Sequence, residues 1–246
     1  MLSPATRADE PLPAGHPCEG CEVRYHAICG VLGCRDLARF KSLGRTVGLA
    51  PGEALFHEGD PATRVFTLTR GTIKLYRLLP DGRRHVTGFL HAGDFLGIGV
   101  GPEHIVSAEA LEEVQLCWFP RNRFDNFIEQ YVAMERSLYR AAADELAAAQ
   151  EQMLLLARKT ASERVASFIL ELSERTAFRS PSSANVRLPM SRSDIADYLG
   201  LTKETVSRVI SSFKKRGLIR LRTTDEVELI DRAQLERIAR CEATDD

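Results

Sequence analysis

Cysteine is the residue of this chain whose spacing is most indicative of chemistry. Four of the six cysteines lie within eighteen residues, in the pattern C-x2-C-x7-C-x4-C, and they are Cys18, Cys21, Cys29 and Cys34. The other two, Cys117 and Cys241, are far away in sequence. Such a cluster suits a disulfide, a tetrahedral zinc site or an iron–sulfur cluster. The four clustered thiolates could close a zinc site alone, so their spacing leaves these alternatives open.

The cellular compartment bears on the choice. No apolar run is long enough to span a membrane, and the N-terminal residues lack the apolar stretch of a signal peptide. The first seventeen residues, rich in Pro and Ala, are predicted to be a flexible tail. We therefore expect a cytoplasmic protein, in which thiols stay reduced and structural disulfides are rare. This expectation disfavours the disulfide.

Charge is distributed unevenly along the chain. The 246 residues carry a net charge of −1, with 44% hydrophobic and 27% charged residues, which fits one large or two modest domains. Residues 187–222 nevertheless hold nine Lys or Arg and only three acidic residues, a net charge of +6. A basic end on a near-neutral chain is typical of a nucleic-acid-binding module. No nucleophile–base pair or phosphate-cradling loop stands out, so we do not expect an enzyme.

The cysteine-rich segment is followed in the sequence by a β-rich segment that must help to position it. Residues 1–50 are interpreted as the tail and cysteine-rich segment, with a short bridge at 35–50 that could be helical. Residues 51–120 contain β-prone runs separated by glycines at even intervals of 11 or 12 residues, which predicts a β-roll. Residues 112–119 form its last predicted strand, with Val114, Leu116 and Trp118 on one face and Cys117 on the other.

Residues 121–158 are rich in strong helix formers and predict one long helix. Its apolar stripe recurs at steps of three and four residues and consists of Leu138, Ala142, Leu146, Ala149, Met153 and Leu156. A narrow stripe on a helix without a neighbouring partner helix indicates the seam of a homodimer, although packing within the same domain would give a similar pattern.

Residues 159–246 predict a DNA-binding domain. Ser191 and Asp194 resemble a capping box, Gly200 suits a turn, and Thr202 suits the N-cap of a second helix. Together they predict a helix–turn–helix followed by two short strands that form a wing. The N-terminal part of the second helix would enter the major groove and present Lys203, Glu204, Thr205, Ser207 and Arg208. Arg can bind guanine and Glu can accept from cytosine, although Glu204 and Arg208 could instead form a surface ion pair.

This order of elements resembles the CRP/FNR family of transcription regulators, over about residues 18–240. The most specific motifs are ETVSR at 204–208, LPMSRSDIADYLGLT at 188–202 and MLLLARKTASERVASFIL at 153–170. The resemblance implies an α+β fold with an N-terminal cyclic-nucleotide-binding-like jelly roll, a long dimerisation helix and a C-terminal winged helix–turn–helix. Glu204, Ser207 and Arg208 match the FNR-like branch, which implies a homodimeric activator that binds a TTGAT–N4–ATCAA palindrome and works with RNA polymerase.

The resemblance also implies a role for the cysteines. Oxygen-sensing members hold an oxygen-labile 4Fe–4S cluster through three N-terminal cysteines and a fourth in the roll, which map onto Cys18, Cys21, Cys29 and Cys117. Cys34 is an alternative third ligand, and Cys241 is expected to be a plain thiol. Oxygen would degrade the cluster and weaken the dimer. A clusterless or nucleotide-responsive activator and a zinc-stabilised DNA-binding protein are the alternatives.

The sequence gives weak support to nucleotide binding. Ile98 stands where cyclic-AMP-binding relatives carry a ribose-binding Glu, and Ile105 and Val106 stand near the position of the phosphate-binding Arg. A phosphodiester in an apolar pocket needs a cationic partner. We therefore do not expect the roll to bind a nucleotide.

Overall fold

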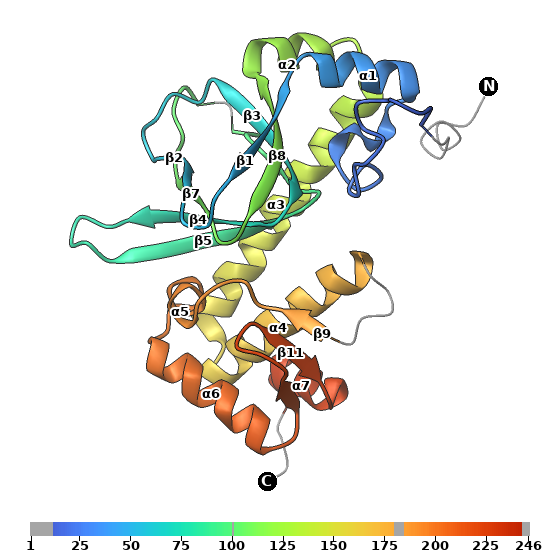
Figure 1. Cartoon of the computed structure of the whole chain (residues 1–246). Coiled ribbons are helices and arrows are strands. Elements are labelled where there is room, and N and C mark those ends of the chain that lie inside the picture. Colours follow the sequence, from blue (N-terminus) through green and yellow to red (C-terminus); the bar gives the residue numbers. More distant parts are fainter. Residues whose placement is uncertain (1–11, 100, 180–184, 243–246) are drawn as a thin grey trace. The chain divides into compact units, whose positions relative to one another are not determined.

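The computed structural model describes residues 12–99, 101–179 and 185–242 (Figure 1). Two compact units share the chain. The first comprises residues 1–77 and 87–147, and the second comprises residues 78–86 and 148–246. Most of the predicted flexible tail lies outside the described residues.

The first unit contains most of two four-stranded sheets (Figure 1), and residues 78–86, at the end of one hairpin of these sheets, belong to the second unit. One sheet has the strand order β1-β8-β3-β6, with β1 at Arg45–Leu49, β8 at Val114–Pro120, β3 at Arg64–Arg70 and β6 at Phe95–Leu96. The other has the order β2-β7-β4-β5, with β2 at Ala54–Phe56, β7 at Ser107–Ala110, β4 at Thr72–Leu78 and β5 at Arg84–His91. These sheets confirm the predicted roll. The strand β1 precedes Pro51, so the sheet begins inside the stretch that we interpreted as a bridge.

Strand β8 separates two apolar cores, because successive side chains of a strand point to opposite faces. Val114 and Leu116 are each 1% exposed and belong to a core between the two sheets, against which Trp118 also packs. Cys117 and Phe119 belong to the other face, where a second core gathers. The predicted two-faced last strand is therefore confirmed.

The second core is aromatic and holds the cysteine-rich segment. Phe40 of α1 (Cys34–Ser42) stacks on Phe119 with ring centroids 4.3 Å apart, and Phe124 and Phe127 of α2 (Arg121–Ile128) pack beside them. Ile28, on the short 3-10 helix η2 (Ile28–Val31), belongs to the same core. This core anchors the N-terminal segment to the sheet that contains β8.

The range 121–158 is two helices and not one. Helix α2 ends at Ile128, and α3 spans Val132–Arg158. Tyr131 lies between them; its ring stacks on Phe127 at 4.3 Å, and its hydroxyl donates to Asp36 of α1 at 2.7 Å. The contact with α1 lies at this break, where helix propensity alone predicted continuation. None of the helices in the described ranges is long and apolar enough to cross a membrane.

The second unit has the predicted winged helix–turn–helix. Its helices are α4 (Ala161–Arg179), α5 (Arg192–Leu199), α6 (Lys203–Lys215) and α7 (Arg232–Ala239). A three-stranded sheet has the order β10-β11-β9, with β10 at Ile219–Leu221, β11 at Glu226–Leu229 and β9 at Asn185–Arg187. The strand β9 adds a third strand to the two that the sequence indicated.

Candidate functional site

The cysteine-rich segment is a series of tight turns that His16 closes into a loop. The Cys21 amide donates to the Cys18 carbonyl at 3.2 Å, and the Arg24 amide donates to the Cys21 carbonyl at 3.3 Å. His16 Nδ1 accepts from the Cys18 amide at 3.1 Å, so Nε2 is the nitrogen that donates to the Cys34 carbonyl, 3.0 Å away. One imidazole thus joins the start of the segment to the start of α1.

Three thiols of this segment interact electrostatically with one another and with Cys117. Burial raises the pKa of Cys18 to about 11 and that of Cys29 to about 12, and it also raises the pKa of Cys21. Nearby thiols add to each shift, and Cys117 acts on all three. Cys34 is not among the groups that affect these pKa values most. The tertiary fold therefore brings Cys18, Cys21, Cys29 and Cys117 into one neighbourhood.

These thiols are partly buried, as is Cys34, whereas Cys241 is exposed. Cys18, Cys29 and Cys117 pack against the aromatic core, and Cys21 packs against Val23, Ala27 and Ala92. Within the described residues, no three His, Cys, Asp or Glu side chains converge closely enough to hold a single metal ion. The arrangement is a loose group of thiols at the edge of an apolar core.

A cation that the sequence did not indicate as a site residue contacts one of these thiols, Cys117. Lys41, in the last turn of α1, donates from Nζ to Cys117 Sγ at 2.8 Å and to Thr46 Oγ1 at 2.6 Å. Thr46 of β1 and Cys117 of β8 are directly paired in the sheet. No local spacing rule links Lys41 to Cys117, because 76 residues separate them, so only the fold could reveal the contact.

The second candidate site is the exposed face of α6. Thr202 Oγ1 accepts from the Thr205 amide at 3.2 Å and caps the helix, as predicted. Val206, Val209, Ile210 and Phe213 are buried beneath it. Lys203, Glu204 and Arg208 are exposed, and Thr205 and Ser207 are partly exposed. The five predicted base-reading side chains therefore lie on or at the edge of the solvent face.

Arg208 is held only weakly in the uncomplexed chain. Its Nη2 donates to Thr205 Oγ1 at 3.2 Å. Among the ion pairs of the described residues, none joins Glu204 to Arg208. The alternative of a surface ion pair between these two side chains is therefore not seen, and both charges face solvent.

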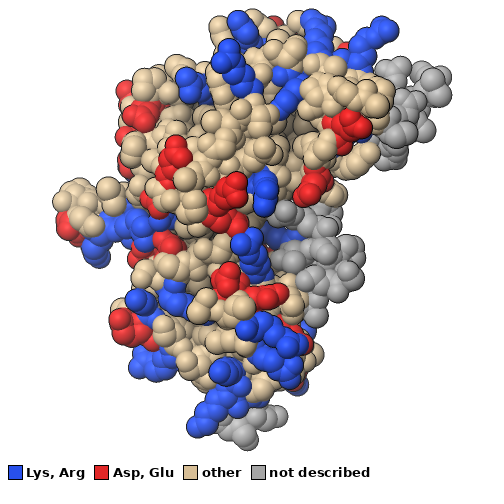
Figure 2. All heavy atoms as spheres, viewed as in Figure 1, with Lys and Arg blue, Asp and Glu red and all other residues tan. Residues whose placement is uncertain are grey.

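Basic residues lie on α6 and on the wing, and Figure 2 shows Lys and Arg atoms at several places on the visible face of the second unit. Lys214 and Lys215 are exposed at the C-terminal end of the helix. On the wing, Arg220 and Arg222 each pair with Glu228, at 3.0 and 2.9 Å. The helix thus offers exposed cations, whereas the two wing arginines share one acid.

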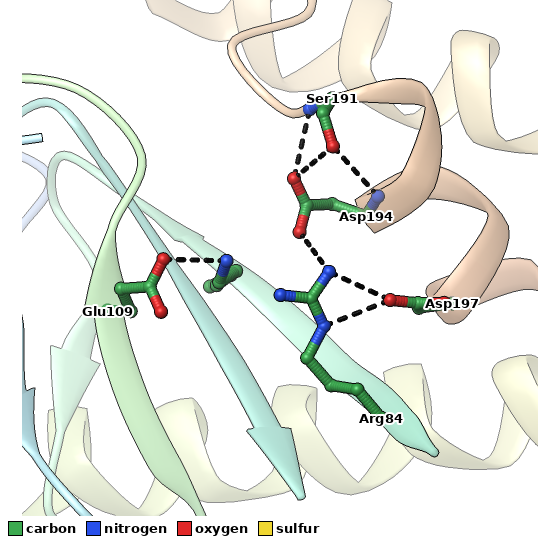
Figure 3. Close-up of polar contacts among 6 residues, drawn as sticks. Arg84, Glu109, Ser191, Asp194 and Asp197 are labelled. Carbon is green, nitrogen blue, oxygen red and sulfur yellow. Dashed lines mark hydrogen bonds and ion pairs between the residues drawn. The ribbon is translucent and has the colours of Figure 1, made fainter. Parts of the chain in front are cut away.

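The first helix of the motif is anchored by its cap (Figure 3). The Asp194 carboxylate accepts from the Ser191 amide at 3.1 Å, and the Ser191 hydroxyl accepts from the Asp194 amide at 3.1 Å, which confirms the capping box. In the same unit, Arg84 Nη2 lies 2.8 Å from Asp194 and 2.8 Å from Asp197. Asp194 therefore both caps α5 and pairs with an arginine. Gly200 follows with φ of 61°, the left-handed turn that favours glycine.

The nucleotide-related positions of the roll carry apolar side chains in two different environments. Ile98 packs against the aromatic core, and Ile105 is 77% exposed. The nearby Arg121 guanidinium is committed to backbone, because it donates to the carbonyls of Ala62 and Gly97 at 2.9 and 2.8 Å. Ile98 and Ile105 carry no charge, and Arg121 is bonded to backbone carbonyls, so none of these three residues offers a cation to a phosphodiester.

Comparison with known proteins agrees with this architecture. Residues 46–131 match the model of the cyclic nucleotide-binding domain, and residues 163–238 match that of the Crp-like helix-turn-helix domain. The nitrogen fixation regulation protein FixK of Bradyrhizobium diazoefficiens is 41% identical over 92% of this chain and 95% of its own. The transcriptional activatory protein AadR of Rhodopseudomonas palustris is 42% identical over 92% of this chain and 94% of its own.

A solved structure shows the same fold. FixK2 from Bradyrhizobium japonicum superposes with a TM-score of 0.75 at 35% identity, covering 82% of this chain and 99% of its own. The relatives are transcription regulators, which are not enzymes. With a roll, a long helix and a winged helix–turn–helix in that order, the chain belongs to the CRP/FNR family of DNA-binding transcription regulators.

Proposed function

We propose that this regulator is an oxygen-responsive activator whose homodimer binds DNA when Cys18, Cys21, Cys29 and Cys117 hold a 4Fe–4S cluster. The observation that carries the proposal is the grouping of Cys18 and Cys29 with Cys117 of β8 against one apolar core, with Cys21 packed beside Cys29. Thiolates are the preferred ligands of such clusters. A zinc site formed by the N-terminal cysteines alone would need Cys34, which lies outside that grouping.

The donor set fits the cluster. Four sulfurs come from two segments, a turn-rich loop and a rigid strand, so the loop can adjust around a group that the strand fixes on one side. The sulfurs border an apolar core, which limits access of water. When bound, the cluster would supply an oxygen-labile group with four thiolate attachments. The chain's own part is to tie the N-terminal loop to β8 through those attachments.

A second copy of the chain would cover α3. The middle of its apolar stripe is exposed, with Leu146 at 61% and Met153 at 62%, and Ala149 lies between them. The ends of the stripe already have partners within the chain. Leu138 packs against the aromatic core, and Leu156 lies beside Gly200. Burial of the central apolar side chains in a homodimer seam would stabilise the pair.

The dimer would place two α6 helices on DNA. A two-fold protein recognises a palindrome, and the TTGAT–N4–ATCAA sequence supplies a guanine and a cytosine to each half-site for Arg208 and Glu204. RNA polymerase is the expected partner at the promoter. The exposed Lys214 and Lys215 would bind phosphates and not bases.

The test is the composition of protein purified without air. We expect brown protein with about four iron and about four sulfide per chain. Replacing Cys18, Cys21, Cys29 or Cys117 by Ala should abolish the iron, since each change removes a ligand. Cys34→Ala and Cys241→Ala are the matched controls and should keep it.

Two outcomes would contradict this assignment. Colourless protein with about one zinc per chain would refute the oxygen sensor and favour a zinc-stabilised regulator. Iron lost from Cys34→Ala but kept by Cys29→Ala would show that the third ligand is Cys34.

A further inference from the structure

The contact between Lys41 and Cys117 has a chemical character that an ordinary lysine contact lacks. The Lys41 ammonium has two acceptors, Thr46 Oγ1 at 2.6 Å and Cys117 Sγ at 2.8 Å. A neutral thiol is a weak acceptor, whereas hydrogen bonds from a cation to an anionic acceptor are among the strongest in proteins. The geometry therefore suits a sulfur that carries negative charge, as a thiolate ligand does.

The same ammonium acts on other thiols of the site. Burial raises the pKa of Cys18 and Cys21, and the Lys41 charge acts on both thiols in the opposite direction while its ammonium contacts Cys117. Arg24, which is buried, exerts the same kind of attraction on Cys18. The thiols are partly buried, and salt and solvent screen partly buried charges less than charges at an open surface. Four thiolates at one place would repel one another, and Lys41 offsets part of that repulsion.

We propose that Lys41 is a positioning residue that holds the Cys117 thiolate, raises the reduction potential of the cluster and slows its oxidation by dioxygen. This inference rests on the proposed 4Fe–4S function. Hydrogen bonds to ligand sulfurs and nearby charge are the means by which a protein sets the potential of such a cluster. A cation beside the ligands makes an electron harder to remove. In the oxidative step one electron would pass from the cluster to dioxygen, which would become superoxide.

Placement on α1 gives Lys41 its fixed position. Lys41 follows Phe40, whose ring is buried against Phe119 and Phe124, so the helix cannot rotate without breaking the aromatic core. A basic side chain in the last turn of a helix also interacts favourably with the helix dipole. The ammonium is therefore held beside Cys117 by packing as well as by its own hydrogen bonds.

The experiment compares full-length wild-type protein with Lys41→Met, purified without air. Iron and sulfide content, the midpoint potential from a dye-mediated titration and the loss of visible absorbance in air-saturated buffer are measured. Removing a partner of a metal ligand typically costs about tenfold or more, so Lys41→Met should lose its absorbance about tenfold faster. Its potential should fall by about 59 mV, the equivalent of tenfold for one electron. Arg35→Met removes an exposed charge from the same helix and should match wild type.

The possible results separate this inference from the proposed function. If wild type holds the cluster and Lys41→Met equals it in potential and in rate of loss, the inference fails and the proposed function stands. If wild type holds no cluster, both fail. If Lys41→Met does not assemble a cluster, the same measurements on Lys41→Arg and Lys41→Gln test the inference instead. The arginine variant keeps the charge, so its potential and its rate of cluster loss must be closer to those of wild type than the values of the glutamine variant. If the two variants behave alike, or in the reverse order, the inference is overturned.

Discussion

Replacement of Arg208 by Ala tests the proposed readout of DNA with little disturbance of the fold. The side chain is exposed, and its one hydrogen bond within the described chain joins it to Thr205 Oγ1 at 3.2 Å. The substitution breaks no ion pair with Glu204. Alanine is also the strongest helix former, so α6 should remain folded. A change in DNA affinity would therefore report an interaction that Arg208 makes with DNA.

The expected magnitude follows from two half-sites. A bidentate arginine–guanine contact contributes about 1–3 kcal/mol of discrimination, and a homodimer on a palindrome makes two of them. Arg208→Ala should thus weaken binding to TTGAT–N4–ATCAA by about 2–6 kcal/mol, between about thirtyfold and about twenty-thousandfold. On a duplex with the guanine replaced in both half-sites, the variant and the wild type should bind with similar affinity.

The assay is fluorescence anisotropy without air, with each duplex titrated at several salt concentrations. Lys215→Ala is the control, because this exposed side chain at the C-terminal end of α6 should reach only phosphates. It should weaken all duplexes alike and reduce the salt slope by about one for each phosphate that is no longer bound. Our reasoning is refuted if Arg208→Ala weakens every sequence equally while Lys215→Ala changes base preference. The recognition helix would then lie in the groove the other way round.

Three further variants test the dimer, the helix cap and the sheet beside the thiols. Ala149→Asp places two carboxylates across the proposed seam, so light scattering without air should find a monomer that retains iron, and a dimer would place the seam elsewhere. Ser191→Ala removes the hydroxyl that caps the Asp194 amide and should lower the free energy of unfolding by about 1 kcal/mol in urea titrations; an unchanged value would argue against the capping box. Gly44→Ala would drive a Cβ into the Trp118 carbonyl oxygen and should cost about 1–3 kcal/mol, whereas Gly20→Ala meets no atom within 4 Å and should leave stability unchanged. If Gly44→Ala is as stable as Gly20→Ala, β8 can shift to accommodate the added Cβ with little loss of stability.

Local patterns identified the DNA-binding domain without the structure. A capping box, a left-handed glycine and an N-cap threonine each depend on residues within four positions of one another, so Ser191, Gly200 and Thr202 marked the helix–turn–helix correctly. Alternation along β8 likewise placed Val114 and Leu116 on one face and Cys117 on the other. Such signals arise from backbone geometry that neighbouring residues determine.

The tertiary structure decided what local patterns left open. At the break between α2 and α3, Tyr131 donates to Asp36, 95 positions away, a contact that the continuous run of helix formers did not indicate. The grouping of Cys117 with the N-terminal thiols, and of Lys41 with Cys117, depends on the pairing of β1 with β8 and on the aromatic core that fixes α1. Contacts between segments so distant follow from sheet register and core packing. A spacing of residues along the chain cannot specify these, because many registers are compatible with the same local pattern.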